Sequence, residues 1–308
     1  MLISYMGLEE LQKSLGTMHS ALETFNSRQF ITSQYYNSLK ERKEIRANNA
    51  LSYAKKILGA VLSVSPRYKF ISASDSSRGY DLVTSSLGFM AGLDREVIRT
   101  FRASENERGQ VELTAVIGEK GAEQMSLEEE ILFIEDFDGT QKKLETKATE
   151  LVKIIVPHII NSNIGQIDIF HPTRGNSSHS PYIIKSTIFS NSLFQIAPEI
   201  EDRELVVESD YKEILAYSLE KYFHLAFQDV LEDAKLAEYK ARLNHLASNI
   251  NGTKSQITYL GKAIKRYKDG VAQQEQNDRV SAELLRKKRK RSKERMSIFL
   301  SRMNPNNP

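Results

Sequence analysis

Hydrophobic residues recur at every third or fourth position over a long stretch near the C-terminus. The spacing alternates between three and four residues without a break, and every member except Thr253 is apolar. A sustained period of about 3.5 residues places these side chains on one narrow stripe of a helix, and such a stripe packs against another helix. The members of this C-terminal seam are Leu236, Tyr239, Leu243, Leu246, Ile250, Thr253, Ile257, Leu260, Ile264, Tyr267 and Val271.

A second stripe with the same rhythm lies at the other end of the chain. Residues 6–62 contain no proline and are predicted to be helical, with a weaker seam between Gln29 and Thr32 and an end at Pro66. The region from Tyr211 to Met303 also lacks proline, and as one helix it would be about 140 Å long. We expect the two terminal helices to pair as a coiled coil. The N-terminal seam consists of Leu8, Leu11, Leu15, Met18, Leu22 and Phe25, and it resumes at Tyr36 and Leu39.

The middle of the chain has a different pattern. Short segments rich in β-branched and aromatic residues are bounded by Gly, Ser, Asn or Asp, and helical patterns lie between them. Strands that alternate with helices predict an α/β sheet. The predicted strands are 68–73, 81–84, 111–117, 131–134, 164–170 and 182–189, and the predicted helices are 93–103 and 142–160.

These patterns predict a fold of the α/β class with a long antiparallel coiled coil, in which two terminal helices form a shaft beside a central Rossmann-like domain. We divide the chain into an N-terminal coiled-coil helix (1–65), an α/β head (66–208), a C-terminal coiled-coil helix (209–285) and a basic extension (286–308). The net charge is +3, but residues 286–295 alone carry +7, which leaves −4 for the remainder. The basic character is therefore local.

Composition excludes several classes of chemistry. The chain has no cysteine, which rules out disulfides, thiolate catalysis and zinc–sulfur sites and fits a reducing compartment. No secretory signal is expected at the N-terminus, and the longest apolar stretch, 154–167, is too short to span a bilayer. We therefore expect a cytoplasmic protein that does not insert into the membrane.

No motif for catalysis, cofactor binding or metal binding stands out. The chain lacks a P-loop and a Gly-x-Ser-x-Gly elbow, and His171 and His179 lack the spacing of metal ligands. Residues 136–139 with Glu145 resemble part of a calcium loop, but the first ligand position would be Ile134, which favours an ordinary turn. We predict no catalytic, cofactor or metal residues.

Three stretches resemble the gamma subunit, the central rotor shaft, of F1-type ATP synthases. Residues 84–94 (Thr-Ser-Ser-Leu-Gly-Phe-Met-Ala-Gly-Leu-Asp) resemble the family's Thr-Ser-Asp-Arg-Gly-Leu-Cys-Gly-Gly-Phe-Asn segment, and residues 117–121 (Ile-Gly-Glu-Lys-Gly) resemble its Ile-Gly-Lys-Lys-Gly. The third stretch falls in register with the long C-terminal helix of the family. Its matching positions are Glu238, Ala241, Arg242, Leu243, Leu246, Ile257, Leu260, Glu275 and Ala282.

The resemblance implies an antiparallel coiled coil that turns inside a ring of three alpha and three beta subunits, with the α/β head at its foot. Such a part couples ATP hydrolysis or synthesis in the ring to rotation, and thereby to ion transport, and carries no catalytic residues. Implied partners are the alpha3beta3 hexamer, an epsilon-like subunit, and a membrane rotor or adaptor at the foot. The complex would lie peripherally on the inner face of the cell membrane.

Departures from the family pattern mark a divergent member. The Arg-Gln pair with which the family touches a beta-subunit loop falls on Lys268 and Asp269, and a following Thr falls on Gln273. Lysine lacks the planar fork of arginine, and aspartate adds a charge. The resemblance suggests a specialised paralogue, linked to motility or another role outside ATP synthesis in a wall-less bacterium. The expected ring-contact residues are Arg242, Lys268, Asp269, Gln273 and Glu275.

The basic run extends beyond the usual end of the family, near Ala282. Its charge density exceeds what a helix end needs to complement its dipole, and the run contains no aromatic residue for stacking on nucleic acid bases. We expect the helix to continue through 286–303 and to meet an acidic partner. An alternative function is a non-rotary coiled-coil adaptor that holds acidic partners with this tail. The expected tail-binding residues are Arg286, Lys287, Lys288, Arg289, Lys290 and Arg291.

Overall fold

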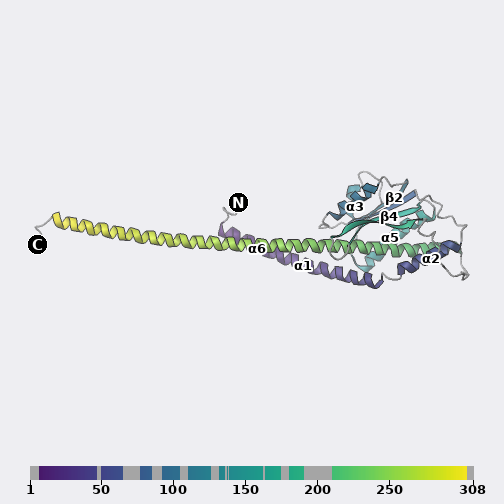
Figure 1. Cartoon of the computed structure of the whole chain (residues 1–308), viewed down its shortest axis with the longest axis horizontal. Helices are drawn as coiled ribbons and strands as arrows, with labels where there is room; N and C mark the ends of the chain where they lie inside the picture. Colours follow the sequence, from purple (N-terminus) through teal and green to yellow (C-terminus); the bar gives the residue numbers. More distant parts are fainter. Residues whose placement is uncertain are drawn as a thin grey trace. The chain divides into compact units, whose positions relative to one another are not determined.

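The computed structural model describes residues 7–46, 50–64, 77–84, 92–104, 110–125, 132–135, 137, 139–161, 164–174, 180–190 and 210–303. Its elements, several of which are labelled in Figure 1, are α1 (Leu8–Arg46), α2 (Ala50–Val64), β1 (Ser77–Val83), α3 (Leu93–Ala103), β2 (Gln110–Ile117), α4 (Glu119–Met125), β3 (Leu132–Ile134), α5 (Gln141–Ile160), β4 (Gln166–Thr173), β5 (Tyr182–Ser190) and α6 (Tyr211–Met303).

The chain divides into two compact units. The helical unit contains residues 1–26 and 249–308, and the mixed unit contains residues 27–248. Helices α1 and α6 contribute to both units, because each passes from one set of residues to the other. The four-part division drawn from the sequence remains a prediction.

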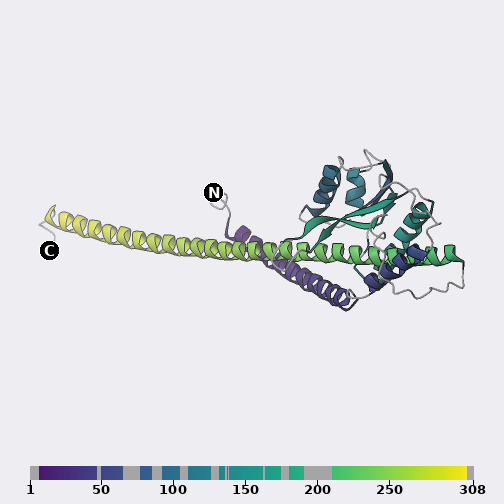
Figure 2. The same ribbon diagram turned by 45° about the vertical axis from the view of Figure 1, so that its right-hand side comes forward.

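The sheet of the mixed unit has five strands in the order β3-β2-β1-β4-β5. The first four strands are parallel, and β5 pairs antiparallel with β4 at the edge. Parallel neighbours joined by helices are the Rossmann-like arrangement expected from the alternating pattern. In Figure 2, α3 lies on one side of the sheet and α6 runs along the other. The expected combination of an α/β sheet with long terminal helices is therefore confirmed.

Each face of the sheet has its own hydrophobic cluster. On the α3 face, the rings of Tyr80, Phe101 and Phe170 lie with centroids 5.5–6.1 Å apart. On the other face, Val83, Ala115 and residues of β4 pack against α2, α5 and the first part of α6. Because both faces are covered, β1 is continuously buried over 79–83 and β2 over 114–117, without an alternating pattern.

The ends of β1 and β2 meet through Thr84. Its Oγ1 donates a hydrogen bond to the Ile117 carbonyl at 2.6 Å and accepts one from the Gly121 backbone nitrogen at 3.2 Å. A Cβ at Gly121 would lie 2.4 Å from this Oγ1 and 2.8 Å from Cγ1 of Val116. The two sequence motifs that suggested a family thus contact each other, and the contact requires glycine at position 121.

We expect Gly121→Ala to destabilise the mixed unit by about 1–3 kcal/mol, because the added methyl group overlaps buried atoms on two sides. Urea denaturation of the purified chain measures the loss. The matched control is Gly261→Ala, where an added Cβ meets nothing within 4 Å in a helix interior. The control should gain about 1 kcal/mol from helix propensity. Equal effects of the two substitutions would contradict the described contact.

In the mixed unit, α1 and α6 run antiparallel. Tyr35 stacks on Tyr239 with ring centroids 6.0 Å apart, and Lys43 pairs with Asp229 and Asp233. Residues later in α1 therefore contact residues earlier in α6. This is the geometry expected of two terminal helices that form a shaft.

In the helical unit, the predicted seams pack together. Leu11 is buried against Leu260 and Ile264, and the polar member Thr253 is only 8% exposed. The last two members of the C-terminal seam differ, since Tyr267 and Val271 are 43% and 44% exposed. The described part of α1 begins only one turn before Leu11, at Leu8.

Other boundaries refine the sequence prediction. The predicted helix 6–62 consists of α1 and α2, and Ile57 of its seam is 40% exposed. The predicted strand 68–73 lies outside the described residues. Helix α4 was not predicted, because its seven residues are too few to show a period. The predicted continuity of the C-terminal helix to Met303 is confirmed.

Candidate functional site

The first candidate site is the place in the mixed unit where α6 is fixed to its neighbours. The Tyr239 hydroxyl accepts a hydrogen bond from the Gly139 backbone nitrogen at 3.1 Å, and Arg42 Nη2 donates to the Gly139 carbonyl at 3.0 Å. Burial raises the pKa of Tyr239, so its hydroxyl stays protonated. A Cβ at Gly139 would lie 2.7 Å from that hydroxyl oxygen. The calcium-like stretch thus contributes a glycine that packs on the helix; Asp136 and Asp138 lie outside the described residues.

A buried charge cluster lies next to this contact. Lys235 Nζ is 2.7 Å from Glu238 Oε2, and Arg242 Nη2 pairs with Glu238 Oε1 on the next turn. The side chains of Lys235 and Glu238 are each 4% exposed. Lys235 Nζ also lies 4.7 Å from the ring centroid of Phe137. One carboxylate thus compensates two cations in a region from which water is largely excluded.

Two further contacts hold the same stretch of α6. Lys43 Nζ lies 2.9 Å from Asp229 Oδ1 and 2.8 Å from Asp233 Oδ1. Lys240 Nζ donates to the Arg174 carbonyl at 3.0 Å. Because these contacts surround the helix, they oppose both rotation of α6 about its axis and sliding along it. We call the set the joint: Arg42, Lys43, Phe137, Gly139, Asp229, Asp233, Lys235, Glu238, Tyr239, Lys240 and Arg242.

The second candidate site is the exposed part of α6 in the helical unit. Every side chain from residue 265 to residue 300 is exposed. This stretch contains the predicted ring-contact residues Lys268, Asp269, Gln273 and Glu275. It also contains the predicted tail-binding residues Arg286, Lys287, Lys288, Arg289, Lys290 and Arg291. A helix that displays charged residues on all sides over this length presents a surface for partners.

Arg242 lies in the other site. Its side chain is 18% exposed and pairs with Glu238 inside the joint. The sequence reasoning placed Arg242 on an outer face because it considered the register of the long helix alone. The assignment of a ring contact to Arg242 stays a prediction, and its described surroundings are those of a residue that holds the joint together.

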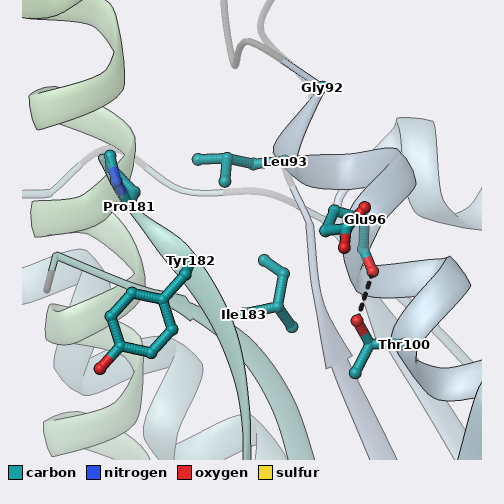
Figure 3. Close-up of a pocket in the computed structure, with 7 residues that line it drawn as sticks. All are labelled: Gly92, Leu93, Glu96, Thr100, Pro181, Tyr182 and Ile183. Carbon is teal, nitrogen blue, oxygen red and sulfur yellow. Dashed lines mark hydrogen bonds between the residues drawn. The ribbon is translucent and has the colours of Figure 1, made fainter. Parts of the chain in front are cut away.

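The cavity in Figure 3 is a weaker candidate. It has a volume of about 420 Å³ and is lined by Gly92, Leu93, Glu96, Thr100, Pro181, Tyr182 and Ile183. Two of its polar side chains are already engaged, because Thr100 donates to the Glu96 carbonyl at 2.8 Å and the Glu96 carboxylate pairs with Arg99.

His171 is a core residue of the sheet. Its Nε2 lies 2.9 Å from Ser186 Oγ, and its Nδ1 lies 3.2 Å from the Pro172 carbonyl. Burial lowers the pKa of His171, which keeps the ring neutral. His179 lies outside the described residues, and within the described ranges no group of three or more potential ligands could hold a metal ion.

Sequence reasoning did not identify most of the joint. The feature of the sequence that marks the joint is the pair of charged residues at positions 235 and 238, directly beside the seam members Leu236 and Tyr239. Charged side chains that flank a seam are common on solvent-exposed coiled coils, so the sequence alone does not show that the sheet domain buries these two.

None of the helices in the described ranges combines the length and apolarity needed to cross a bilayer.

The mixed unit defines a class of protein in which a Rossmann-like sheet packs against a pair of antiparallel helices. No family model matches the chain. In sequence it is similar to the ATP synthase gamma chain of Campylobacter concisus (strain 13826), with 24% identity over 72% of this chain and 77% of the relative. It is also 21% identical to the gamma chain of Campylobacter jejuni (strain RM1221), over 84% of this chain and 92% of the relative.

Solved structures agree on the fold. The rotor of the Euglena gracilis mitochondrial ATP synthase aligns with a TM-score of 0.57 at 12% identity, over 86% of this chain and 98% of that chain. A central-stalk structure from Tetrahymena thermophila mitochondrial ATP synthase gives 0.55 at 15% identity, over 73% and 98%. The chain resembles ATP synthase gamma chains in sequence and in fold, as a divergent, gamma-like protein.

Proposed function

We propose that this chain is the central-stalk rotor subunit of an F1-type or F1-like ATPase. It would couple ATP hydrolysis or synthesis in an alpha3beta3 ring to rotation. The observation that carries the proposal is a helix of 93 residues that is paired antiparallel with α1, held to the α/β domain by the joint, and exposed on all sides beyond residue 264. The sequence similarity to gamma chains supports the same function.

The mechanism requires no catalytic residue in this chain. A shaft that differs from side to side favours a different conformation in each catalytic subunit that it faces, because its contacts shift the equilibrium between open and closed states. The proposed contact residues Lys268, Asp269, Gln273 and Glu275 are exposed and available for this role. Lys268 and Asp269 carry opposite charges at adjacent positions, so we expect each to contact a different residue of the ring.

The head is the proposed foot of the stalk. An epsilon-like subunit, and a membrane rotor or another adaptor, would bind there and place the complex peripherally on the inner face of the cell membrane. The unusual residues at 268 and 269 and the basic extension favour a specialised ATPase, such as one linked to motility, over a housekeeping synthase. Mass spectrometry of the purified complex tests this point. Co-purifying subunits of a membrane ion channel would contradict the specialised role and support ATP synthesis.

A second candidate function is a non-rotary adaptor that binds acidic partners with residues 286–295. The high density of exposed positive charge favours it. The two functions differ in the isolated chain, because the adaptor would form a stable homodimer through its long helix. The rotor uses an intramolecular coil and stays monomeric. Analytical ultracentrifugation decides between a mass of one chain, 35.1 kDa, and twice that mass.

We expect deletion of residues 285–308 to leave ATPase activity within about twofold of wild type, while it changes assembly or partner recruitment. The reason is that the deletion spares the proposed ring contacts at 268–275 and the joint. The measurement is ATP hydrolysis by the purified complex, with its subunit composition determined in parallel. Complete loss of hydrolysis in an assembled complex would show that the tail has been assigned to the wrong place.

A further inference from the structure

The charge on the last part of α6 is spread over most of the circumference of the helix. We call residues 286–295 the basic collar; it contains eight bases and one acid, Glu294. Successive residues of an α-helix are separated by about 100° around the axis. On that basis four bases share one side: Lys287, Lys288, Arg291 and Arg295. The other four share a side centred about 160° away: Arg286, Arg289, Lys290 and Lys293.

The collar cannot be explained as a helix cap. Complementation of the helix dipole acts only within the last turn, and Arg295 lies eight residues before the end of α6 at Met303. Like charges three and four residues apart repel each other along a helix, and the collar contains such pairs along its entire length. Within the described residues no ion pair is recorded for any of these eight side chains, and all are exposed.

The collar also differs from a helix that lies on a surface. A membrane-bound helix has an apolar face opposite a polar one, whereas the two sides of the collar are equally basic. The exposed apolar residues that follow do not form a single face either: Met296, Phe299 and Leu300 lie within about 100° of one another, whereas Ile298 lies about 160° from Met296 and Leu300. A partner that touched one side of the helix would leave half of the bases uncompensated.

We propose that the basic collar lies inside a closed ring of acidic side chains contributed by the subunits that surround the shaft. This inference rests on the proposed function and adds to it a contact and its chemistry. A shaft that turns must be matched by its surroundings at every angle, and a patch on one side would hold it at a single angle. When positive charge around most of the helix faces carboxylates around the whole ring, the attraction depends little on the angle of rotation.

The two sides of the collar provide a matched pair of variants. Each half variant replaces four bases by glutamine, and both carry the same net charge. One combines K287Q, K288Q, R291Q and R295Q; the other combines R286Q, R289Q, K290Q and K293Q. The measurement is the fraction of this chain that stays bound in complexes purified from cells and washed with 0.5 M NaCl. If the partner is an acidic ring, the two half variants should lower this fraction by the same factor, within about twofold. A variant with all eight replacements should lower it further, because it also removes the charge interactions that each half variant keeps and that the salt wash only weakens by screening.

A second measurement locates the partner directly. A photo-crosslinking residue is placed at Ser292 or at Glu294, which lie about 160° apart around the helix. In the assembled complex, both positions should crosslink to acidic segments of the same type of ring subunit. Crosslinks from one position only, or retention that depends on only one half, would overturn the proposal in favour of a partner on one side.

Other outcomes separate this inference from the proposed function. If the wild-type chain co-purifies with a ring ATPase and all collar variants are retained like wild type, the collar proposal fails and the rotor function stands. If no ring ATPase co-purifies, both fail. A further control mixes the wild-type chain and the two half variants with vesicles that contain 30% anionic lipid, or with single-stranded RNA. If the wild-type chain binds and only one half variant loses that binding, the acidic ring is overturned.

Discussion

Replacing Glu238 by alanine is expected to destabilise the mixed unit by about 3–5 kcal/mol, because it leaves two nearby cations without their carboxylate. Lys235 is almost fully buried, and Arg242 is mostly buried. Lys235 cannot regain the lost hydration without leaving its contact with the Phe137 ring. Urea denaturation of the purified chain measures the change.

The matched control is Glu283→Ala, which removes the same side chain from an exposed turn of the same helix. It should alter stability by no more than about 0.5 kcal/mol. A triple variant with Lys235→Met, Glu238→Leu and Arg242→Met should recover most of the loss, since an apolar cluster needs no charge compensation. If Glu238→Ala behaves like the control, the joint is not a buried charge cluster.

The Asp81→Asn variant is expected to be more stable than wild type at pH 8, by up to about 4 kcal/mol. Asp81 lies in β1 between Ala115 and Ile169, on the face that packs against α5 and α6. Its Oδ2 is buried and has no hydrogen-bond partner. Burial in these surroundings raises the pKa of Asp81 from 3.8 to about 7.

The sign of the pH dependence follows from proton binding. Below pH 3.8 the carboxyl is protonated in both states and affects stability little. Between 3.8 and about 7 the unfolded chain releases the proton while the folded chain retains it, so the contribution to stability falls as pH rises. Above about 7 the loss is complete. Asparagine does not ionise, and its advantage should therefore grow from pH 4 to pH 7 and then level off.

Denaturation midpoints measured from pH 4 to pH 8 test this expectation. The control is Asp269→Asn, which replaces an exposed carboxylate and should give a pH profile parallel to that of wild type. An Asp81→Asn profile that also runs parallel to wild type would contradict the raised pKa of the buried Asp81 carboxyl.

The long elements could be predicted from the sequence because their periodicity reports burial directly. Helix α6 runs from Tyr211 to Met303, as the absence of proline predicted, and the seam members from Leu236 to Ile264 are buried or partly buried. Helix α3 also has its predicted bounds. In these segments local pattern and tertiary packing agree, since one stripe faces one partner.

The rest depends on contacts between distant residues. The reversed direction of β5 follows from its pairing with β4, and neither strand carries a local signal for it. The need for glycine at 121 comes from Thr84, 37 residues away. The burial of Lys235 and Glu238 comes from Phe137 and from packing of the α/β domain. Single residues of this kind cannot be recognised from composition or period.

The rotor function is tested most directly by purifying the tagged chain from its native cells and imaging the particles that come with it. The account predicts a hexameric ring of alternating nucleotide-binding subunits with one copy of this chain. Residues 265–300 should lie within the ring, and the α/β domain should lie outside it. A chain that purifies alone, or as a homodimer without any ring ATPase, would contradict the central claim.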